Sequence, residues 1–237
     1  MKKLKLILLI ITAILLLFAA FALYSFYPML SMKPVETGRV FDTEIFAVKN
    51  GMNSSFLIKA NDGYILFDAG SNAQKFEASL NEMEINANDI KYIFLTHSDS
   101  DHLNALALFP NAEIYMSRNE LPMINKTVKR NQFGSNSLPA GIDINEITLL
   151  SDEQEITAGG VIIKCITAPG HTPGSMIYFF NEKYLFTGDA FKMNNGKFSV
   201  HPFSMDSDQS KRTILNISEL AHNADIILTS HFGIRKK

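Results

Sequence analysis

The stretch Tyr92-Ile-Phe-Leu-Thr-His97-Ser-Asp99-Ser-Asp101-His102 places four possible metal ligands directly after an apolar run. The run itself, residues 92–95, is short, apolar and rich in aromatic side chains, which predicts a buried strand. Residues 103–109 are helix formers and precede a proline, which predicts a helix. The four polar side chains therefore lie on a strand-to-helix loop, where they can turn toward one point. Three such carboxylates or imidazoles can already hold a divalent ion and leave positions open for water.

The composition of the chain predicts one ordinary globular domain. Its 237 residues carry a formal net charge of -2, and 46% of them are hydrophobic, which is enough for a full core. Because neither basic nor acidic residues are in excess, we expect no nucleic-acid partner. The single cysteine, Cys165, lies in the apolar run 161–166, so it cannot form an intramolecular disulfide and is expected to be a core thiol rather than a metal ligand.

The N-terminal segment predicts a membrane anchor. Met1-Lys-Lys-Leu-Lys5 is basic, and residues 6–27 carry no charge. A helix of about 22 residues is about 33 Å long, which is enough to cross a hydrocarbon core of about 30 Å. Secretory signals usually have a shorter apolar region of about 7 to 15 residues, which favours an uncleaved anchor. The triplet Ala20-Phe-Ala22 nevertheless resembles a cleavage site, and secretion is the alternative.

The lysines before this segment predict its orientation. Basic residues at the start of a span keep the N-terminus in the cytoplasm and place the rest of the chain outside. We therefore divide the chain into an anchor with its linker, residues 1–33, and a folded domain, residues 34–237. The domain is expected outside the cytoplasm, attached to the cell membrane by a single-pass helix, or secreted if the segment is cleaved.

The first half of the domain predicts an antiparallel meander followed by a helix. Strands are expected over residues 40–48, 53–59 and 64–67. The turns Lys49-Asn-Gly51 and Asn61-Asp-Gly63 favour hairpins between them. A helix is expected over residues 72–83, which have apolar side chains at helical spacing. Asp68, at the end of the third strand, is interpreted either as a carboxylate that supports a metal ligand or as a turn cap.

The second half predicts further strands separated by two long loops. Strands are expected over residues 113–116, 147–150, 160–168, 176–180, 184–186 and 225–228, with a helix over 206–222. Residues 125–145 and 191–203 have no periodic apolar pattern and contain glycine and proline. Long loops in compact domains often line a binding site, so we expect both to form pocket walls, although a surface insertion is an equal alternative for the first.

Three more motifs each place one possible ligand after a predicted strand. They are Pro169-Gly-His171-Thr-Pro-Gly174, Thr187-Gly-Asp189 and Thr229-Ser-His231. The prolines and glycines around His171 fix a specific loop shape. Two other histidines match no motif: His222 falls at the end of the predicted helix, and His201 is expected either near a substrate or exposed.

Together with His97-Ser-Asp-Ser-Asp101-His102, these motifs resemble the metallo-β-lactamase-fold hydrolases over residues 40–231. The resemblance implies an αββα sandwich, in which two mixed β-sheets are flanked by helices, and a site for two divalent metal ions. It implies that the first ion is bound by His97, Asp99 and His171, the second by Asp101, His102 and His231, and that Asp189 bridges them. Two such cations would lower the pKa of a bound water, and Asp101 would orient the resulting hydroxide. The alternative is that His97 and His102 are ordinary polar loop residues.

The cluster departs from the family's common pattern at one position. The family has histidine where this chain has Asp99, and flavodiiron oxygen or nitric oxide reductases also have a carboxylate there. Zinc stays the expected metal, but the harder oxygen ligand makes iron or manganese possible, and we expect the second ion to bind more tightly than the first. The predicted function is hydrolysis of an ester, thioester, lactone or lactam bond in a small substrate. A non-haem iron oxidoreductase and a metal-binding protein without turnover are the alternatives, and the sequence carries no indication of an oligomeric state.

Overall fold

The computed structural model describes residues 2–130, 136–194 and 196–237, and the chain divides into two compact units, Met1–Met32 and Lys33–Lys237. The first unit contains a single long helix, α1 (Lys2–Leu30). Residues Lys3–Leu30 of this helix are long and apolar enough to cross a membrane or to act as a signal sequence. The helix includes Pro28 in its last turn, where the proline ring has no amide to donate to the carbonyl four residues earlier.

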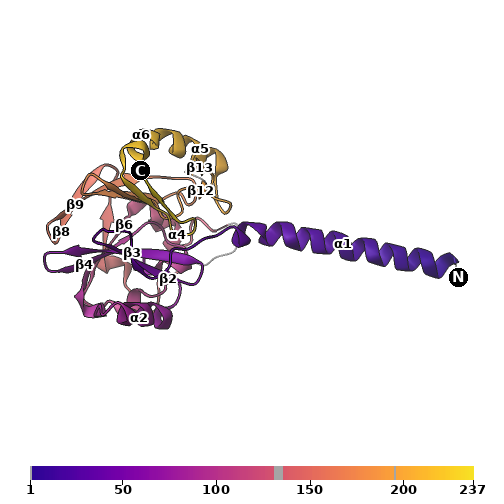
Figure 1. Ribbon diagram of the computed structural model, residues 1–237, viewed down its shortest axis with the longest axis horizontal. Helices are drawn as coiled ribbons and strands as arrows, with labels where there is room; N and C mark the ends of the chain where they lie inside the picture. The colour runs from indigo at the N-terminus through magenta and orange to yellow at the C-terminus, as the bar shows by residue number, and fades with distance from the viewer. Residues whose placement is uncertain (1, 131–135, 195) are drawn as a thin grey trace. The chain divides into compact units, whose positions relative to one another are not determined.

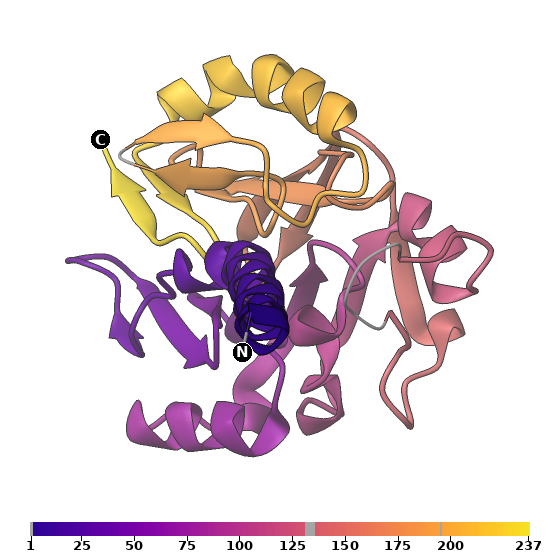
Figure 2. The same cartoon turned by 90° about the vertical axis from the view of Figure 1, so that its right-hand side faces the viewer.

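The second unit is built on two mixed β-sheets (Figures 1 and 2). The strands of the seven-stranded sheet follow the chain order: β1 (Gly38–Arg39), β2 (Ile45–Asn50), β3 (Asn53–Ala60), β4 (Gly63–Phe67), β5 (Ile90–Leu95), β6 (Glu113–Ser117) and β7 (Ile147–Leu150). Strands β1 to β4 pair antiparallel, as the meander prediction requires, and β4 to β7 pair parallel.

The six-stranded sheet has the order β15-β14-β11-β10-β9-β8. Its strands are β8 (Gln154–Ala158), β9 (Val161–Thr167), β10 (Met176–Phe180), β11 (Tyr184–Phe186), β14 (Ile226–Leu228) and β15 (Ile234–Lys236). Neighbours are antiparallel except for β11 and β14, which are parallel. Strands β9, β11 and β14 therefore run in the same direction and end at the same edge of the sheet.

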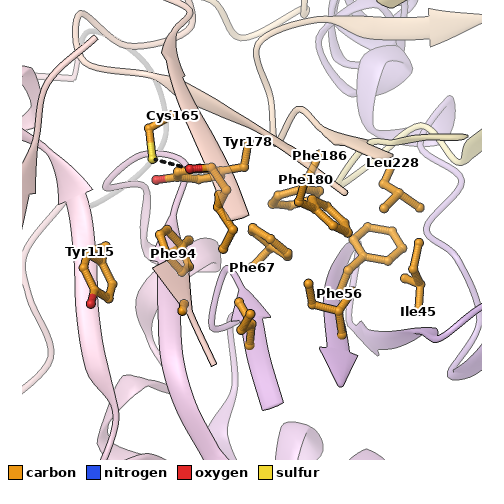
Figure 3. Packing of buried hydrophobic residues seen from close by; sticks show 14 of the residues in the cluster. Ile45, Phe56, Phe67, Phe94, Tyr115, Cys165, Tyr178, Phe180, Phe186 and Leu228 are labelled. Carbon is orange, nitrogen blue, oxygen red and sulfur yellow. Dashed lines mark hydrogen bonds between the residues drawn. The ribbon is translucent and has the colours of Figure 1, made fainter. Parts of the chain in front are cut away.

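The two sheets pack face to face through a core of aromatic and aliphatic side chains (Figure 3). Phe67 of β4 stacks on Phe180 of β10 with ring centroids 4.9 Å apart, so the core joins one sheet to the other. Burying each such side chain contributes roughly 1.5 to 3 kcal/mol. Cys165 lies in the same core, as predicted, and burial raises the pKa of its thiol to about 12.

Helices cover the outer faces of both sheets. Helix α2 (Ala73–Glu82) buries Phe76 and Leu80 against the seven-stranded sheet, and α5 (Ser207–Asn216) and α6 (Ser218–Asn223) lie on the other side of the sandwich (Figures 1 and 2). Two one-turn helices, α3 (Ser100–Leu103) and α4 (Leu121–Ile124), follow β5 and β6. The predicted αββα sandwich is confirmed.

Four predicted elements differ from the structure. The helix expected over 103–109 is absent as one element, because α3 ends at Leu103 and a separate 3-10 helix covers Leu106–Leu108. The strand expected over 40–48 begins only at Ile45, because Phe41 has a φ of 50° and the Thr43 hydroxyl donates to the Val40 carbonyl at 2.6 Å in a turn. The helix expected over 206–222 is divided at Ile217, where α5 ends and α6 begins.

The loop expected over 191–203 contains a hairpin of β12 (Lys192–Asn194) and β13 (Lys197–Ser199). These strands are too short for a periodic pattern to show in the sequence. In the loop expected over 125–145, residues 131–135 lie outside the described part, and a short 3-10 helix, Ile144–Glu146, ends the remainder.

Candidate metal centre

The predicted ligands come from strand ends that meet at one edge of the sandwich. His97 and Asp99 follow β5, and Asp101 and His102 lie in α3, which comes next. The other three predicted ligands, His171, Asp189 and His231, follow the co-directional strands β9, β11 and β14. The structure brings all seven together in three clusters whose ligand atoms lie within 4.8 Å of one another: His97 with His102 and Asp189, His97 with Asp99 and His171, and Asp101 with His102 and His231.

Asp189 lies at the centre of this group. Its Oδ2 atom is 3.2 Å from Nε2 of His231, 3.5 Å from Nε2 of His102 and 3.6 Å from Nε2 of His171. Gly188, the residue before it, has a φ of +50°, and a Cβ there would lie 2.4 Å from the Thr96 hydroxyl. The Thr187-Gly-Asp189 motif therefore requires glycine for the turn that directs this carboxylate between the two predicted ligand sets.

Asp99 and Asp101 contact different histidines. The Oδ2 atom of Asp99 lies 3.1 Å from Nε2 of His171 and 3.4 Å from Nε2 of His97. The Oδ2 atom of Asp101 lies 3.3 Å from Nε2 of His231 and 3.7 Å from Nε2 of His102. These two groups have the composition that the family resemblance implies for the first and second ions, and their role as ligands stays a prediction.

Asp68 contacts the ring nitrogen of His102 that faces away from the cluster. Nδ1 of His102 lies 2.7 Å from Oδ2 of Asp68, whose Oδ1 accepts the Thr96 amide at 2.8 Å. The carboxylate is fully buried, and its contact leaves Nε2 of His102 facing the cluster. A carboxylate that holds the distal nitrogen of a histidine is the usual support of a metal-binding imidazole. The geometry therefore favours the supporting interpretation of Asp68 over a simple turn cap.

His201 is also a member of the site. From the sequence it was expected either near a substrate or exposed. It lies after β13, is 2% exposed, and its Nε2 is 3.6 Å from Oδ2 of Asp189, forming a further cluster with His171. Burial lowers the pKa of His201 well below its usual value, against the opposing effect of Asp189. No motif surrounds this histidine, and the only sequence signal was its position in an expected pocket wall. His222, by contrast, is exposed on α6.

Arg130 also reaches the site, although no pattern in the sequence indicates it. Its side chain is 3% exposed, and Nη2 lies 2.9 Å from Oδ2 of Asp99. The residue belongs to the long loop after α4, which was expected to form a pocket wall. The local sequence does not distinguish a basic residue of this loop that is buried in the site from one that is exposed to solvent.

The site concentrates negative charge around imidazoles. Burial acts to lower the pKa of His231, but Asp189 and Asp101 outweigh it and raise the pKa to about 10. Burial likewise opposes ionisation of His102, and the charges of Asp101, Asp68 and Asp189 raise its pKa well above the usual range. Such a field stabilises a cation, whether it is a proton on the imidazole or a metal ion that displaces that proton.

The unpaired polar atoms of the site fit a metal centre. Within the described ranges, buried atoms of the predicted ligands without a hydrogen-bond partner include His97 Nε2, Asp99 Oδ1 and Asp189 Oδ1. Buried polar atoms are almost always paired, so three unpaired nitrogen and oxygen atoms on clustered ligand-type residues suit a bound partner that is not a protein group. Imidazole nitrogen and carboxylate oxygen together suit divalent transition metals, zinc among them.

Comparison with known proteins identifies the family. The model of the metallo-beta-lactamase superfamily matches residues 48–231 of the chain. The protein therefore belongs to the metallo-beta-lactamase superfamily, and the family resemblance inferred from its motifs is confirmed.

Two curated relatives each match over less than half of their own length. PksB of Bacillus subtilis, described as a probable polyketide biosynthesis zinc-dependent hydrolase, is 34% identical over 128 residues, which are 53% of this chain and 48% of that protein. The anaerobic nitric oxide reductase flavorubredoxin homolog of Escherichia coli O157:H7 is 27% identical over 176 residues, which are 71% of this chain and 39% of that protein. The chain thus spans about half the length of the first relative and less of the second.

Solved structures of metallo-beta-lactamases share the fold. A subclass B3 enzyme of Bradyrhizobium japonicum superposes with a TM-score of 0.64 at 18% identity and covers 85% of this chain and 79% of its own. A B3 enzyme described as having an active site glutamic acid superposes with a TM-score of 0.66 at 19% identity. The match covers 91% of this chain and 87% of the chain of that enzyme. At these identities the similarity shows the fold alone.

Proposed function

We propose that the protein is a metal-dependent hydrolase that binds two divalent cations, with zinc as the expected metal. The observation that carries this proposal is the position of Asp189, whose Oδ2 atom lies within 3.2 to 3.6 Å of imidazoles from both predicted ligand sets. When bound, such cations supply a water of lowered pKa and polarise the bond under attack. Membership of the superfamily supports the same activity.

The side chains divide the work of holding this centre. Asp101, His102 and His231 would hold the second ion, and Asp189 would bridge. His97 and His171 would hold the first ion, with Asp99 as the third donor that the family resemblance implies. The carboxylate of Asp101 is 41% exposed, the most accessible in the cluster, so it is placed to orient the nucleophile toward an arriving substrate.

The substrate proposed from the sequence is a small molecule with an ester, thioester, lactone or lactam bond. Each of these bonds has a carbonyl carbon that hydroxide can attack, so the same metal centre could hydrolyse all four. The fold does not identify which of them is the substrate. A second candidate, a non-haem iron oxidoreductase, is favoured by one observation: the carboxylate of Asp99 beside two histidines, a set that suits iron. Helix α1 would attach the domain to the outer face of the cell membrane.

Metal quantification followed by a substrate panel tests this function. Protein purified without chelators should contain close to two metal ions per chain, with zinc in excess of iron and manganese, and should hydrolyse at least one substrate class of the panel. Removal of the ions with a chelator should abolish hydrolysis, and zinc should restore it. Oxygen consumption without hydrolysis would favour the iron oxidoreductase instead, and absence of any bound metal after reconstitution would contradict both.

His201 is proposed to donate a hydrogen bond to the substrate rather than to bind metal. The Phe203 amide donates to Nδ1 of His201 at 3.3 Å, which leaves the proton of the neutral ring on Nε2, the atom that faces Asp189. An N–H group directed at the site can stabilise negative charge that develops on a substrate oxygen.

Replacing His201 with alanine should therefore lower kcat about a hundredfold, since loss of one such donor typically costs 10²- to 10³-fold. The metal content should stay the same as in the wild type, because Nε2 carries a proton and is not a ligand. Steady-state kinetics and metal analysis of the same preparation provide both readouts. Loss of a metal ion from His201→Ala would instead make His201 a ligand, and unchanged kcat would exclude it from the reaction.

A further inference from the structure

Arg130 is fixed against the first metal position by four contacts. Nη1 donates to the carbonyl oxygen of His171 at 2.9 Å, and Nη2 donates to the carbonyl oxygen of Phe203 at 2.9 Å. Nη2 also lies 2.9 Å from Oδ2 of Asp99 and 3.2 Å from Nε2 of His171. With a side chain only 3% exposed, the guanidinium is held between the loops that carry these residues rather than lying on the surface.

Two of these contacts involve atoms that a metal ion would need. A guanidinium has only donors, so its N–H group faces the lone pair of His171 Nε2, and the same lone pair would bind a metal. The carboxylate of Asp99 is the other shared group. A divalent cation bound to these two atoms would lie beside a positive charge that is removed from solvent, where repulsion is weakly screened.

Among the described residues, no comparable cation lies beside the second metal position. Among the salt bridges found within the described residues, those of Asp101 are formed with His102 and His231, both of which are predicted ligands themselves. Arginine keeps its proton at any ordinary pH, whereas an imidazole can lose its proton to a metal ion. The two positions therefore differ in what a metal must displace.

We propose that Arg130 competes with a divalent cation for Asp99 and His171, so that the two metal positions fill in sequence, the second position before the first. The proposal rests on the proposed dinuclear function and adds a regulatory property to it. At low metal supply the guanidinium neutralises Asp99 and keeps the first position closed. At higher supply the Asp99 carboxylate and the His171 imidazole would hold a metal ion, and the guanidinium would move away from them.

Metal titration of chelator-treated protein tests this proposal. Zinc binding measured by isothermal titration calorimetry, with stoichiometry checked by mass spectrometry, should show one tight ion and one bound at least about tenfold more weakly. Arg130→Met should strengthen only the weaker step, by about tenfold or more, because Asp99 is left buried without its cation. Arg130→Lys, which keeps the charge but loses the fork that holds two carbonyls, should give an intermediate constant.

The matched control is Lys129→Met, which removes the same charge from the exposed neighbouring position and should leave both constants unchanged. Thermal unfolding of the metal-free variants shows that they are folded, and Arg130→Lys carries the test if Arg130→Met is not. Two ions bound with equal constants by the wild type, or a weaker step that no Arg130 variant strengthens, would overturn this proposal alone. A wild type that binds no zinc at all would overturn the proposed function, and this proposal with it.

Discussion

Replacing Asp189 with asparagine should lower hydrolysis by at least about a thousandfold and remove at least one of the two metal ions. Asp189 is 4% exposed, and its Oδ2 lies 3.2 to 3.6 Å from the imidazoles of His171 after β9, His231 after β14 and His102 in α3. Burial raises the pKa of Asp189, but the charges of His231 and His102 outweigh it and hold the pKa well below the usual range, so the group is ionised. An amide removes the charge that two cations would share, and a thousandfold loss corresponds to about 4 kcal/mol of transition-state stabilisation.

Metal content and kcat/KM, measured on one preparation of the variant, separate loss of the centre from loss of the fold. Asp225→Asn is the matched control, since Asp225 is an exposed aspartate that immediately precedes β14 and lies outside the metal cluster. It should leave both quantities unchanged. An Asp189→Asn protein that keeps two ions and hydrolyses within tenfold of the wild type would show that Asp189 does not bridge them.

Residues at strand ends were predictable because short apolar runs and turn motifs mark where strands stop. His97, His171, Asp189 and His231 each follow such a run directly, and strands that run the same way deliver their ends to one edge. The hydrophobic pattern thus determines which polar residues meet, even before the pairing of the strands is known. The αββα sandwich was predictable for the same reason, through the family motifs that these strand ends carry.

His201 and Arg130 could not be predicted because neither lies next to a regular element with a clear pattern. His201 reaches Asp189 because the hairpin of β12 and β13 folds its loop over the site, and strands of three residues leave no periodic signal. Arg130 is held by backbone carbonyls at residues 171 and 203, which are distant in sequence. Contacts of this kind depend on tertiary structure. The local sequence around Arg130 therefore does not show whether its side chain is buried in the site or exposed.

Glu120 is a third residue that the sequence did not single out, although it joins the two main ligand loops. Its Oε2 accepts the amide of Ser98 at 3.2 Å and the Ser98 hydroxyl at 2.5 Å, while its Oε1 accepts the amide of Gly174 at 3.1 Å and the hydroxyl of Thr172. The residue is fully buried. Ser98 adjoins His97, and Thr172 adjoins His171, so one carboxylate fixes the spacing between two predicted metal ligands.

Replacing Glu120 with glutamine should destabilise the protein by about 3 kcal/mol, despite the similar shape of the two side chains. Each carboxylate oxygen faces a backbone amide, so the NH₂ group of glutamine meets an N–H donor whichever way it is turned. A hydroxyl can rotate to become an acceptor, but an amide cannot, and a buried donor left without an acceptor costs about 1 to 3 kcal/mol. For a domain of this size, about 3 kcal/mol corresponds to a decrease in Tm of roughly 6 to 12 °C.

The same substitution should also weaken metal binding, because the loops that carry His97 and His171 lose their common anchor. Residues that orient metal ligands typically change affinity by about 10- to 100-fold. Thermal unfolding of the metal-free protein and zinc titration measure the two effects separately, with the exposed Glu77→Gln on α2 as a control that should change neither. A purely structural role would lower Tm and leave zinc affinity unchanged at temperatures where the variant is folded. A decrease in both would show that the buried carboxylate sets the geometry of the metal centre as well as the stability of the fold.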